Sequence, residues 1–290
     1  MNGEGSESLS KTTKSILNKH GIRLNKNLGQ NYLIDKNKRN QIINFGELTK
    51  EDVVLEIGSG IGTLTIELAK RAKKVIAIEQ DSNICEILNQ RLKNEKIDNV
   101  ELINEDALKI EFPKFNKIVS NLPYQISSPI TFKFLDYDFD LAVLMYQKEF
   151  GDRMNGEVGS KNYSRLSAML YFKCDVNPLT EVSCESFLPK PKVDSIVMGL
   201  APKESELTKD EFNAYSKFTK ALFQHRNKKI RNALIDSRHI VSNLDKKEIK
   251  RRLNDIEDEK LNDYLTKRVV VLTPEEILFI SKELNPIFND

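Results

Sequence analysis

The sequence predicts an α/β protein, with a doubly wound, Rossmann-like domain followed by a small all-helical C-terminal domain. Short apolar runs alternate with helix-like stretches between residues 52 and 147, which is typical of a parallel sheet covered by helices. A glycine-rich turn joins the first apolar run to the first helix-like stretch. Residues 208–290 have helical spacing and no convincing strand signal.

The chain begins with a basic segment, residues 1–22, that we expect to be flexible. Its opening, MNGEGSESLSKTTK, is rich in Ser, Thr, Gly and Lys and contains almost nothing apolar. A segment of this composition buries too little apolar surface to offset the entropy lost on ordering. It also lacks the apolar stretch of a secretory signal, so the protein is expected to stay in the cytoplasm.

Residues 23–204 are predicted to form the doubly wound domain. The run DVVLEI at 52–57 predicts a buried strand, TLTIELAKRA at 63–72 a helix, and KVIAIE at 74–79 a second strand, which together make one βαβ unit. Later strand-like runs occupy 99–104, 116–121 and 140–146, and the run at 193–200 is expected to close the sheet.

Residues 205–290 are predicted to form the helical domain, after a polar linker, APKESEL. Thr208 and Glu211 fit a capping box, in which the hydroxyl and the carboxylate each satisfy a free amide of the first helical turn. Thr273 and Glu276 repeat the pattern, with Pro274 at the first helical position, where its missing N–H is not needed.

Length and composition indicate a globular protein without a membrane role. Of its 290 residues, 39% are hydrophobic and 30% are charged, and no uncharged apolar stretch approaches the roughly 18 residues of a membrane span. Cys85, Cys174 and Cys184 lack the spacing of a CxxC metal site, so we expect reduced cysteines and no metal. A monomer is expected.

The net charge of +2 conceals two basic segments. Residues 10–40 carry eight Lys or Arg against one Asp, and residues 217–252 carry twelve against three acids. Such a distribution suits a protein that holds a polyanion while its remaining, acidic surface repels it. Lysine-rich runs are also common on solvated helix faces, so either segment alone leaves both interpretations open.

The glycine-rich turn is predicted to bind a nucleoside. Gly58 and Gly60 stand between a strand and a helix, where glycine lets the backbone turn sharply and a ligand lie against the main chain. Glu79 ends the next strand, where a carboxylate can accept the ribose hydroxyls of an adenosine. The GxGxG spacing, together with Asp106 after a third strand to accept the adenine amino group, favours S-adenosylmethionine over NAD. Taken alone, the turn also fits a purely structural role.

The segment NLPY at 121–124 has the residue types needed to present an adenine amine for methylation. The lone pair of that amine is delocalised into the ring, so hydrogen-bond acceptors must localise it. Asn121 can accept one amine hydrogen, and the carbonyl of Leu122, held extended by Pro123, can accept the other. Tyr124 offers a flat face for an extruded base. In an arbitrary protein the same residues would more often mark a loop leaving a strand.

These motifs, in this order, resemble the ribosomal RNA adenine N6-dimethyltransferases, a family that includes the Ksg and Dim enzymes and, more distantly, the Erm methylases. The resemblance runs from about Leu24 to the C-terminus and is carried by LGQNYLID, LEIGSGIGTLT, AIEQD, NEDAL, NLPYQISSP and FLPKPKVDS. It implies that Phe187 joins Tyr124 in sandwiching the target adenine. It also implies an S-adenosylmethionine site formed by Gln30, Asn31, Leu33, Gly58, Gly60, Glu79, Asp106 and Asn121.

The stretch FQHRNKKIRNAL at 223–234 resembles the Ksg and Dim branch, and the Lys- and Ile-rich composition looks archaeal. That branch dimethylates N6 of two adjacent adenosines in the 3′-terminal hairpin of small-subunit rRNA during ribosome biogenesis. The resemblance therefore implies a pre-small-subunit partner. The residues expected to bind its RNA are Arg226, Lys228, Lys229 and Arg231. Three alternatives stay open: an Erm-type large-subunit methylase, an assembly factor that docks without catalysis, and a DNA adenine methylase.

Overall fold

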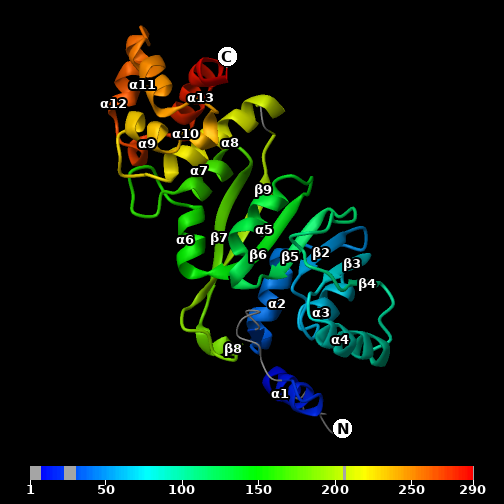
Figure 1. The fold of residues 1–290 in the computed structure, drawn as a ribbon. Helices are drawn as coiled ribbons and strands as arrows, with labels where there is room; N and C mark the ends of the chain where they lie inside the picture. The colour runs from blue at the N-terminus through cyan, green and yellow to red at the C-terminus, as the bar shows by residue number, and fades with distance from the viewer. Residues whose placement is uncertain (1–7, 23–30, 205–206, 290) are drawn as a thin grey trace, which may run out of the picture. The chain divides into compact units, whose positions relative to one another are not determined.

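A computed structural model describes residues 8–22, 31–204 and 207–289 (Figure 1). The chain divides into two compact units. The first, which we call the sheet unit, comprises Met1–Gly151 and Val176–Pro202; the second, the helical unit, comprises Asp152–Asp175 and Lys203–Asp290. The chain enters the helical unit for the second time after Pro202, two residues before the domain boundary expected at 204. Residues 152–175, which were expected in the first domain, belong to the helical unit.

The sheet unit contains a seven-stranded sheet in the order β4-β3-β2-β5-β6-β9-β7. The strands β2 to β6 are parallel, and β9 pairs with β6 in the antiparallel direction. The doubly wound α/β fold predicted from the sequence is therefore confirmed. The strands are β2 (Val53–Ile57), β3 (Lys74–Ile78), β4 (Val100–Ile103), β5 (Lys117–Asn121), β6 (Leu141–Gln147), β7 (Cys174–Val182) and β9 (Ser195–Pro202), and a separate pair joins β1 (Tyr32–Leu33) to β8 (Phe187–Leu188).

The central strands are buried because helices cover the sheet. In β2 and β3 every residue after the first is buried, and apart from Glu56 in β2 these buried residues are all apolar rather than alternating with polar ones. Their register pairs Val54 with Val75, and both side chains belong to the main core cluster. The helices of the sheet unit are α2 (Lys36–Phe45), α3 (Thr65–Ala69), α4 (Ser82–Asn94) and α5 (Ser127–Phe134), and α6 (Lys148–Met154) leads out of it.

The run at 193–200 was expected to close the sheet, and this expectation is wrong. Its strand, β9, lies between β6 and β7, so β7 forms the edge. The sequence of β7, CDVNPLTEV, contains Pro178 and mostly exposed or half-buried residues. Proline cannot donate a ladder hydrogen bond and is tolerated at a sheet edge, which explains both the position of β7 and the absence of an apolar signal for it.

The N-terminal segment contains a helix where the structure describes it. Helix α1 (Leu9–Lys19) begins at Ser8, whose side chain accepts a hydrogen bond from the N–H of Lys11. Thr13 and Leu17 lie four residues apart, on one face of the helix, and both are buried. Leu17 packs in a cluster with Tyr32, Ile61, Ile84 and Ile87. This tertiary contact orders a segment that composition alone marks as polar.

In the helical unit, the described residues 207–289 form helices joined by loops, as expected. Both predicted capping boxes form: the N–H of Glu211 donates to Oγ1 of Thr208, and the N–H of Glu276 to Oγ1 of Thr273. The segment 152–175 is held in this unit by Tyr163, whose hydroxyl donates to the carbonyl of Leu272 at 2.8 Å. The helices are α7 (Arg165–Tyr171), α8 (Lys209–Phe223), α9 (Ile230–Asp236), α10 (Arg238–Val241), α11 (Lys246–Asn254), α12 (Glu259–Thr266) and α13 (Pro274–Asn289).

Among the described residues, no helix has the length and apolar character to cross a membrane. Cys85, Cys174 and Cys184 are all unpaired. Within the same parts of the chain, no three His, Cys, Asp or Glu side chains are grouped as metal ligands.

Candidate active site

A pocket opens at the carboxyl ends of the parallel strands. The strand order reverses between β2 and β5, because the chain adds β3 and β4 on one side and then β5 and β6 on the other. Ligands of doubly wound proteins bind at such a switch point. The two strands pair only at Val54 and Leu55, and beyond these the N–H of Ile57 donates instead to Oγ of Ser120 at 2.9 Å. The pocket has a volume of about 260 Å³.

Ten of the predicted site residues line this one pocket. They come from the ends of β2, β3 and β5, from the loop after β4 and from the segment around β1. They are Asn31, Leu33, Gly58, Gly60, Glu79, Asp106, Asn121, Leu122, Pro123 and Tyr124. Gln30, the remaining predicted donor-binding residue of the N-terminal motif, lies outside the described residues.

The glycine turn adopts backbone conformations that side chains other than glycine rarely take. Gly58 and Gly60 have φ of +72° and +54°, in the left-handed region. The N–H of Gly60 donates to Oε2 of Glu79 at 2.9 Å. Glu79, which follows the neighbouring strand β3, therefore fixes the position of the turn.

Glu79 also binds the chain that follows it. Its Oε1 accepts from the N–H of Asp81 at 3.0 Å, and Asp81 in turn caps helix α4. Burial raises the pKa of Glu79 above its ordinary value. Each carboxylate oxygen keeps a second lone pair, so the side chain can still accept hydrogen bonds from a ligand's hydroxyls.

Asp106 lines the pocket from the loop after β4. Its Oδ1 accepts from the N–H of Leu108 at 3.0 Å, and its Oδ2 lies 3.3 Å from Nζ of the exposed Lys109. The backbone bond fixes one carboxylate oxygen, while the exposed Lys109 competes for the other. The geometry suits an acceptor for an exocyclic amine.

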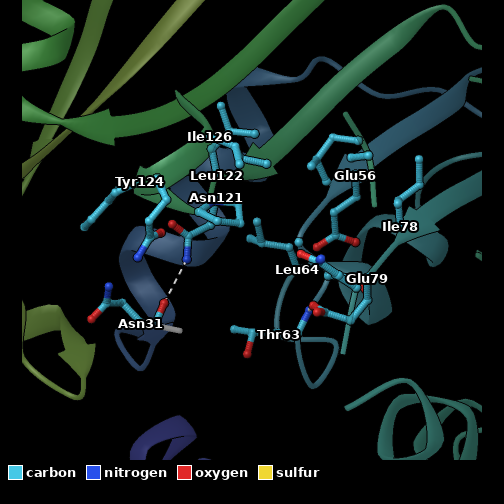
Figure 2. A pocket seen from close by; sticks show the side chains of 18 of the residues that line it. Asn31, Glu56, Thr63, Leu64, Ile78, Glu79, Asn121, Leu122, Tyr124 and Ile126 are labelled. Atoms are coloured by element: carbon cyan, nitrogen blue, oxygen red, sulfur yellow. Dashed lines mark hydrogen bonds between the residues drawn. The ribbon is translucent and has the colours of Figure 1, made fainter. Parts of the chain in front are cut away.

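Asn121 is anchored by its amide nitrogen, as Figure 2 shows. Its Nδ2 donates to the backbone carbonyl of Asn31 at 3.1 Å. This bond assigns the donor end of the side chain, so Oδ1 is left as the acceptor. The N-terminal motif and the NLPY segment, 90 residues apart, therefore jointly orient one amide.

Tyr124 is held from its far end. Its hydroxyl lies 2.7 Å from Oγ of Ser195 at the start of β9, and burial raises its pKa. Tyr124 begins a short 3₁₀ helix, Tyr124–Ile126, directly after Pro123, which has φ of −58°. A ring fixed at both ends can stack with little further loss of entropy.

Among the pocket residues that were not predicted from the sequence are four with polar side chains: Tyr32, Glu56, Ser59 and Thr63. Each has a buried side-chain oxygen without a hydrogen-bond partner in the described structure. Burial raises the pKa of Glu56 to about 8. An acid within the otherwise apolar strand VVLEI is the sequence signal that could have marked Glu56.

These four buried oxygens indicate which kind of ligand the pocket can bind. Buried polar atoms without partners each cost about 1–3 kcal/mol, so several around one pocket indicate a polar ligand. The described lining includes Glu56, Glu79, Glu105 and Asp106 but no Lys or Arg. Such a lining favours a positively charged ligand and disfavours the diphosphate of NAD. S-adenosylmethionine, a sulfonium with an amino group and an adenosine, fits these donor and acceptor types. Figure 2 shows Asn121 and Tyr124 on one side of the pocket and Glu56 and Glu79 on the other.

The structure does not bring Phe187 to the pocket. Its side chain is 2% exposed and packs in the main core cluster with Leu33, its partner in the β1–β8 pair. The alternation of β8 directs this ring inward, and of the two predicted stacking residues Tyr124 alone lines the pocket. A second stacking wall at Phe187 stays a prediction.

Three of the four predicted RNA-binding residues have side-chain contacts within the helical unit. The guanidinium of Arg226 donates to the carbonyls of Ser160 and Lys161, at 2.9 and 2.8 Å. Arg231 donates to the carbonyl of Leu253 at 3.1 Å. Lys228 is paired with Asp236 at 2.7 Å, and Lys229 is exposed. Direct contact with RNA therefore stays a prediction for all four.

Comparisons with known proteins agree with this site. The family model described as ribosomal RNA adenine dimethylase matches residues 21–271. Probable ribosomal RNA small subunit methyltransferases A from Methanosphaera stadtmanae and Methanothermobacter thermautotrophicus are 48% and 47% identical, over 93% and 95% of this chain and 96% of each relative. A crystal structure of a dimethyladenosine transferase from Plasmodium falciparum has a TM-score of 0.73 and 33% identity, over 87% of this chain and 97% of its own.

The 23S rRNA methyltransferase ErmE is also similar, with a TM-score of 0.63 and 26% identity over 88% of this chain and 99% of its own. Both values are lower than those for the dimethyladenosine transferase. The resemblance stated from the motifs is confirmed: the chain belongs to the ribosomal RNA adenine dimethylase family.

Proposed function

We propose that this protein is an S-adenosylmethionine-dependent methyltransferase that dimethylates N6 of two adjacent adenosines in the 3′-terminal hairpin of small-subunit rRNA. The observation that carries the proposal is the bond from Nδ2 of Asn121 to the carbonyl of Asn31, because it leaves Oδ1 as a fixed acceptor in the pocket. The names of the archaeal relatives support the small subunit as the substrate. The cytoplasm, where ribosomal subunits mature in archaea, is the proposed place of action.

The methyl donor would be held by the glycine turn and the acids around it. Glu79 would accept from the ribose hydroxyls and Asp106 from the adenine amine, while the carboxylate of Glu56 lies within the same pocket. When bound, S-adenosylmethionine supplies a methyl group activated by a positively charged sulfur. No general base is needed to activate that methyl group.

The chain's own residues would prepare the target amine. Oδ1 of Asn121 and the carbonyl of Leu122 accept its two hydrogens, which localises the nitrogen lone pair and turns it toward the donor. Tyr124 stacks on the extruded base, so that the amine is positioned in the plane these acceptors define. Positioning and electrostatics thus carry the catalysis.

The test uses undermethylated small subunits and radiolabelled donor, with the modified nucleoside identified by mass spectrometry. We expect N6,N6-dimethyladenosine in the 3′-terminal hairpin and no label in large-subunit RNA or duplex DNA. Asn121→Ala should bind subunits normally and reduce methyl transfer by roughly 10²-fold or more. Label in large-subunit RNA alone would replace the proposal with the Erm-type activity.

A further inference from the structure

The second basic segment, residues 217–252, does not form one uniform surface. Its C-terminal part carries arginines already bound to acids: Arg251 contacts Glu248 and Asp255 at 2.6 and 2.9 Å, and Arg252 contacts Glu248 at 2.9 Å. The hollow beside them is also lined by Glu257, Asp258 and Glu283. An RNA backbone would meet compensated or negative charge at this place.

The N-terminal part of the segment forms a different hollow, which we call the α8–α10 groove. Its volume is about 520 Å³. Lys217 and Lys220 lie at helical spacing along one face of α8, and the C-cap residue Gln224 continues this spacing. The opposite face of α8 is buried through Phe218 and Leu222. The groove is lined by Lys217, Lys220, Gln224, His225, Asp236, Ser237, His239 and Ile240.

The cations of this groove are available. Lys217 and Lys220 are exposed, and in the described structure neither they nor His225 and His239 form an ion pair or side-chain hydrogen bond. The one acid of the lining, Asp236, is paired with Lys228 at 2.7 Å, which holds its pKa below the ordinary value. Lys220 also lies in the last turn of α8, where the helix dipole favours cations. The groove is therefore preformed and positively charged.

We propose that the α8–α10 groove binds consecutive backbone phosphates of the RNA substrate, with Lys217 and Lys220 as its phosphate contacts and His225 and His239 as donors at its other side. That this RNA is small-subunit rRNA rests on the proposed function. Phosphate contacts fix the position of an RNA without reading its bases, so the groove supplies affinity and register, while the pocket selects the adenine.

The test compares two double variants that remove the same charge. Lys217→Gln/Lys220→Gln removes two positive charges from the groove. Lys247→Gln/Lys250→Gln removes two exposed lysines of α11 and is the matched control. Binding of a fluorescein-labelled 3′-terminal hairpin transcript is measured between 50 and 300 mM KCl. Two lost phosphate contacts should lower the salt slope by about 1.4–1.8 and weaken binding roughly tenfold or more at physiological salt. The control should change the affinity less than threefold.

Three further measurements make the outcomes decisive. Thermal unfolding and calorimetric binding of S-adenosylmethionine should be unchanged in both variants, because the substitutions lie in exposed positions outside the donor pocket. Equal losses of RNA affinity in both variants, or an unchanged salt slope in the groove variant, would overturn the proposal that the groove binds phosphates. If the wild-type protein binds the hairpin but transfers no methyl group to small subunits, the proposed function is wrong, while the proposal that the groove binds RNA still holds.

Discussion

Gly58 and Pro123 are in direct contact, so the glycine turn and the NLPY segment are built against each other. A Cβ atom on Gly58 would lie 2.9 Å from both Cγ and Cδ of Pro123, closer than side chains normally approach. Gly58 also has φ of +72°. This contact therefore joins the part of the pocket predicted to hold the donor to the part predicted to hold the base.

Gly58→Ala should damage both parts together. We expect a loss of about 1–3 kcal/mol in stability from backbone strain, with more from the clash, and at least a tenfold weaker donor affinity. Urea unfolding and calorimetry measure the two quantities. Gly21→Ala is the matched control, because Gly21 has φ of +59° but nothing within 4 Å of an added Cβ. Equal behaviour of the two variants would show that the contact with Pro123 does not matter.

Glu56 predicts a pH dependence of stability in the absence of donor. Its pKa is raised to about 8 by burial, so between its unfolded value near 4.5 and pH 8 the folded state binds more protons than the unfolded state. The stability of the wild type should therefore decline as the pH rises through this window. Glu56→Gln, which is neutral throughout, should flatten the decline and gain on the order of 4 kcal/mol relative to wild type at high pH.

The measurement for Glu56 is urea unfolding at several values between pH 5 and pH 9. Glu86→Gln serves as the control, since Glu86 is an exposed carboxylate of α4. It should leave the pH profile unchanged. If Glu56→Gln follows the wild-type profile, the Glu56 carboxyl is not the buried acid that the structure indicates.

Asp106→Ala should weaken donor binding without affecting saturated turnover. A hydrogen bond to a charged group contributes about 1.5–3 kcal/mol, which corresponds to a donor KM raised roughly 10- to 100-fold with kcat nearly unchanged. Lys109→Ala removes only the exposed partner of Oδ2 and should leave the donor KM within a few-fold. Steady-state kinetics at varied donor concentration separate these cases, and an equal effect of both variants contradicts the assignment of Asp106.

Phe187 offers a test that separates packing from stacking. Because its ring is buried in the core, Phe187→Ala should destabilise the protein by about 3–5 kcal/mol. Phe187→Leu fills most of the same space, and we expect it to stay folded and keep methyl transfer within a few-fold. Thermal unfolding and single-turnover transfer are measured on both. A stable Leu variant with a large loss of transfer would establish Phe187 as the second wall around the adenine.

The parallel strands and the pocket could be predicted because each depends on local sequence. Buried parallel strands carry continuous apolar runs, and residues that follow such strands meet at one edge of the sheet. Gly58, Glu79, Asp106 and Asn121 could therefore be placed together without any knowledge of the helices. The capping boxes of α8 and α13 are local for the same reason.

What the sequence did not reveal depends on contacts between distant residues. Helix α1 is ordered by the packing of Leu17 against Ile61, Ile84 and Ile87, which no pattern within the N-terminal segment reports. Similarly, Arg226 belongs to a motif rich in cations, yet its guanidinium binds backbone carbonyls at 160 and 161. Composition measures how much charge a segment carries, but only the fold determines which of those charges are already satisfied.

The position of β9 between β6 and β7 decides when the sheet can be completed as the chain leaves the ribosome. Strand β7 is synthesised first, yet its neighbour in the sheet has not emerged until Ser195–Pro202 is made. Until then β6, buried from Ala142 to Tyr146 in the finished protein, keeps one backbone edge open. Open apolar edges recruit strands from other chains. The nascent protein is therefore most prone to aggregate in that interval, and a chain truncated before Ser195 would remain so permanently.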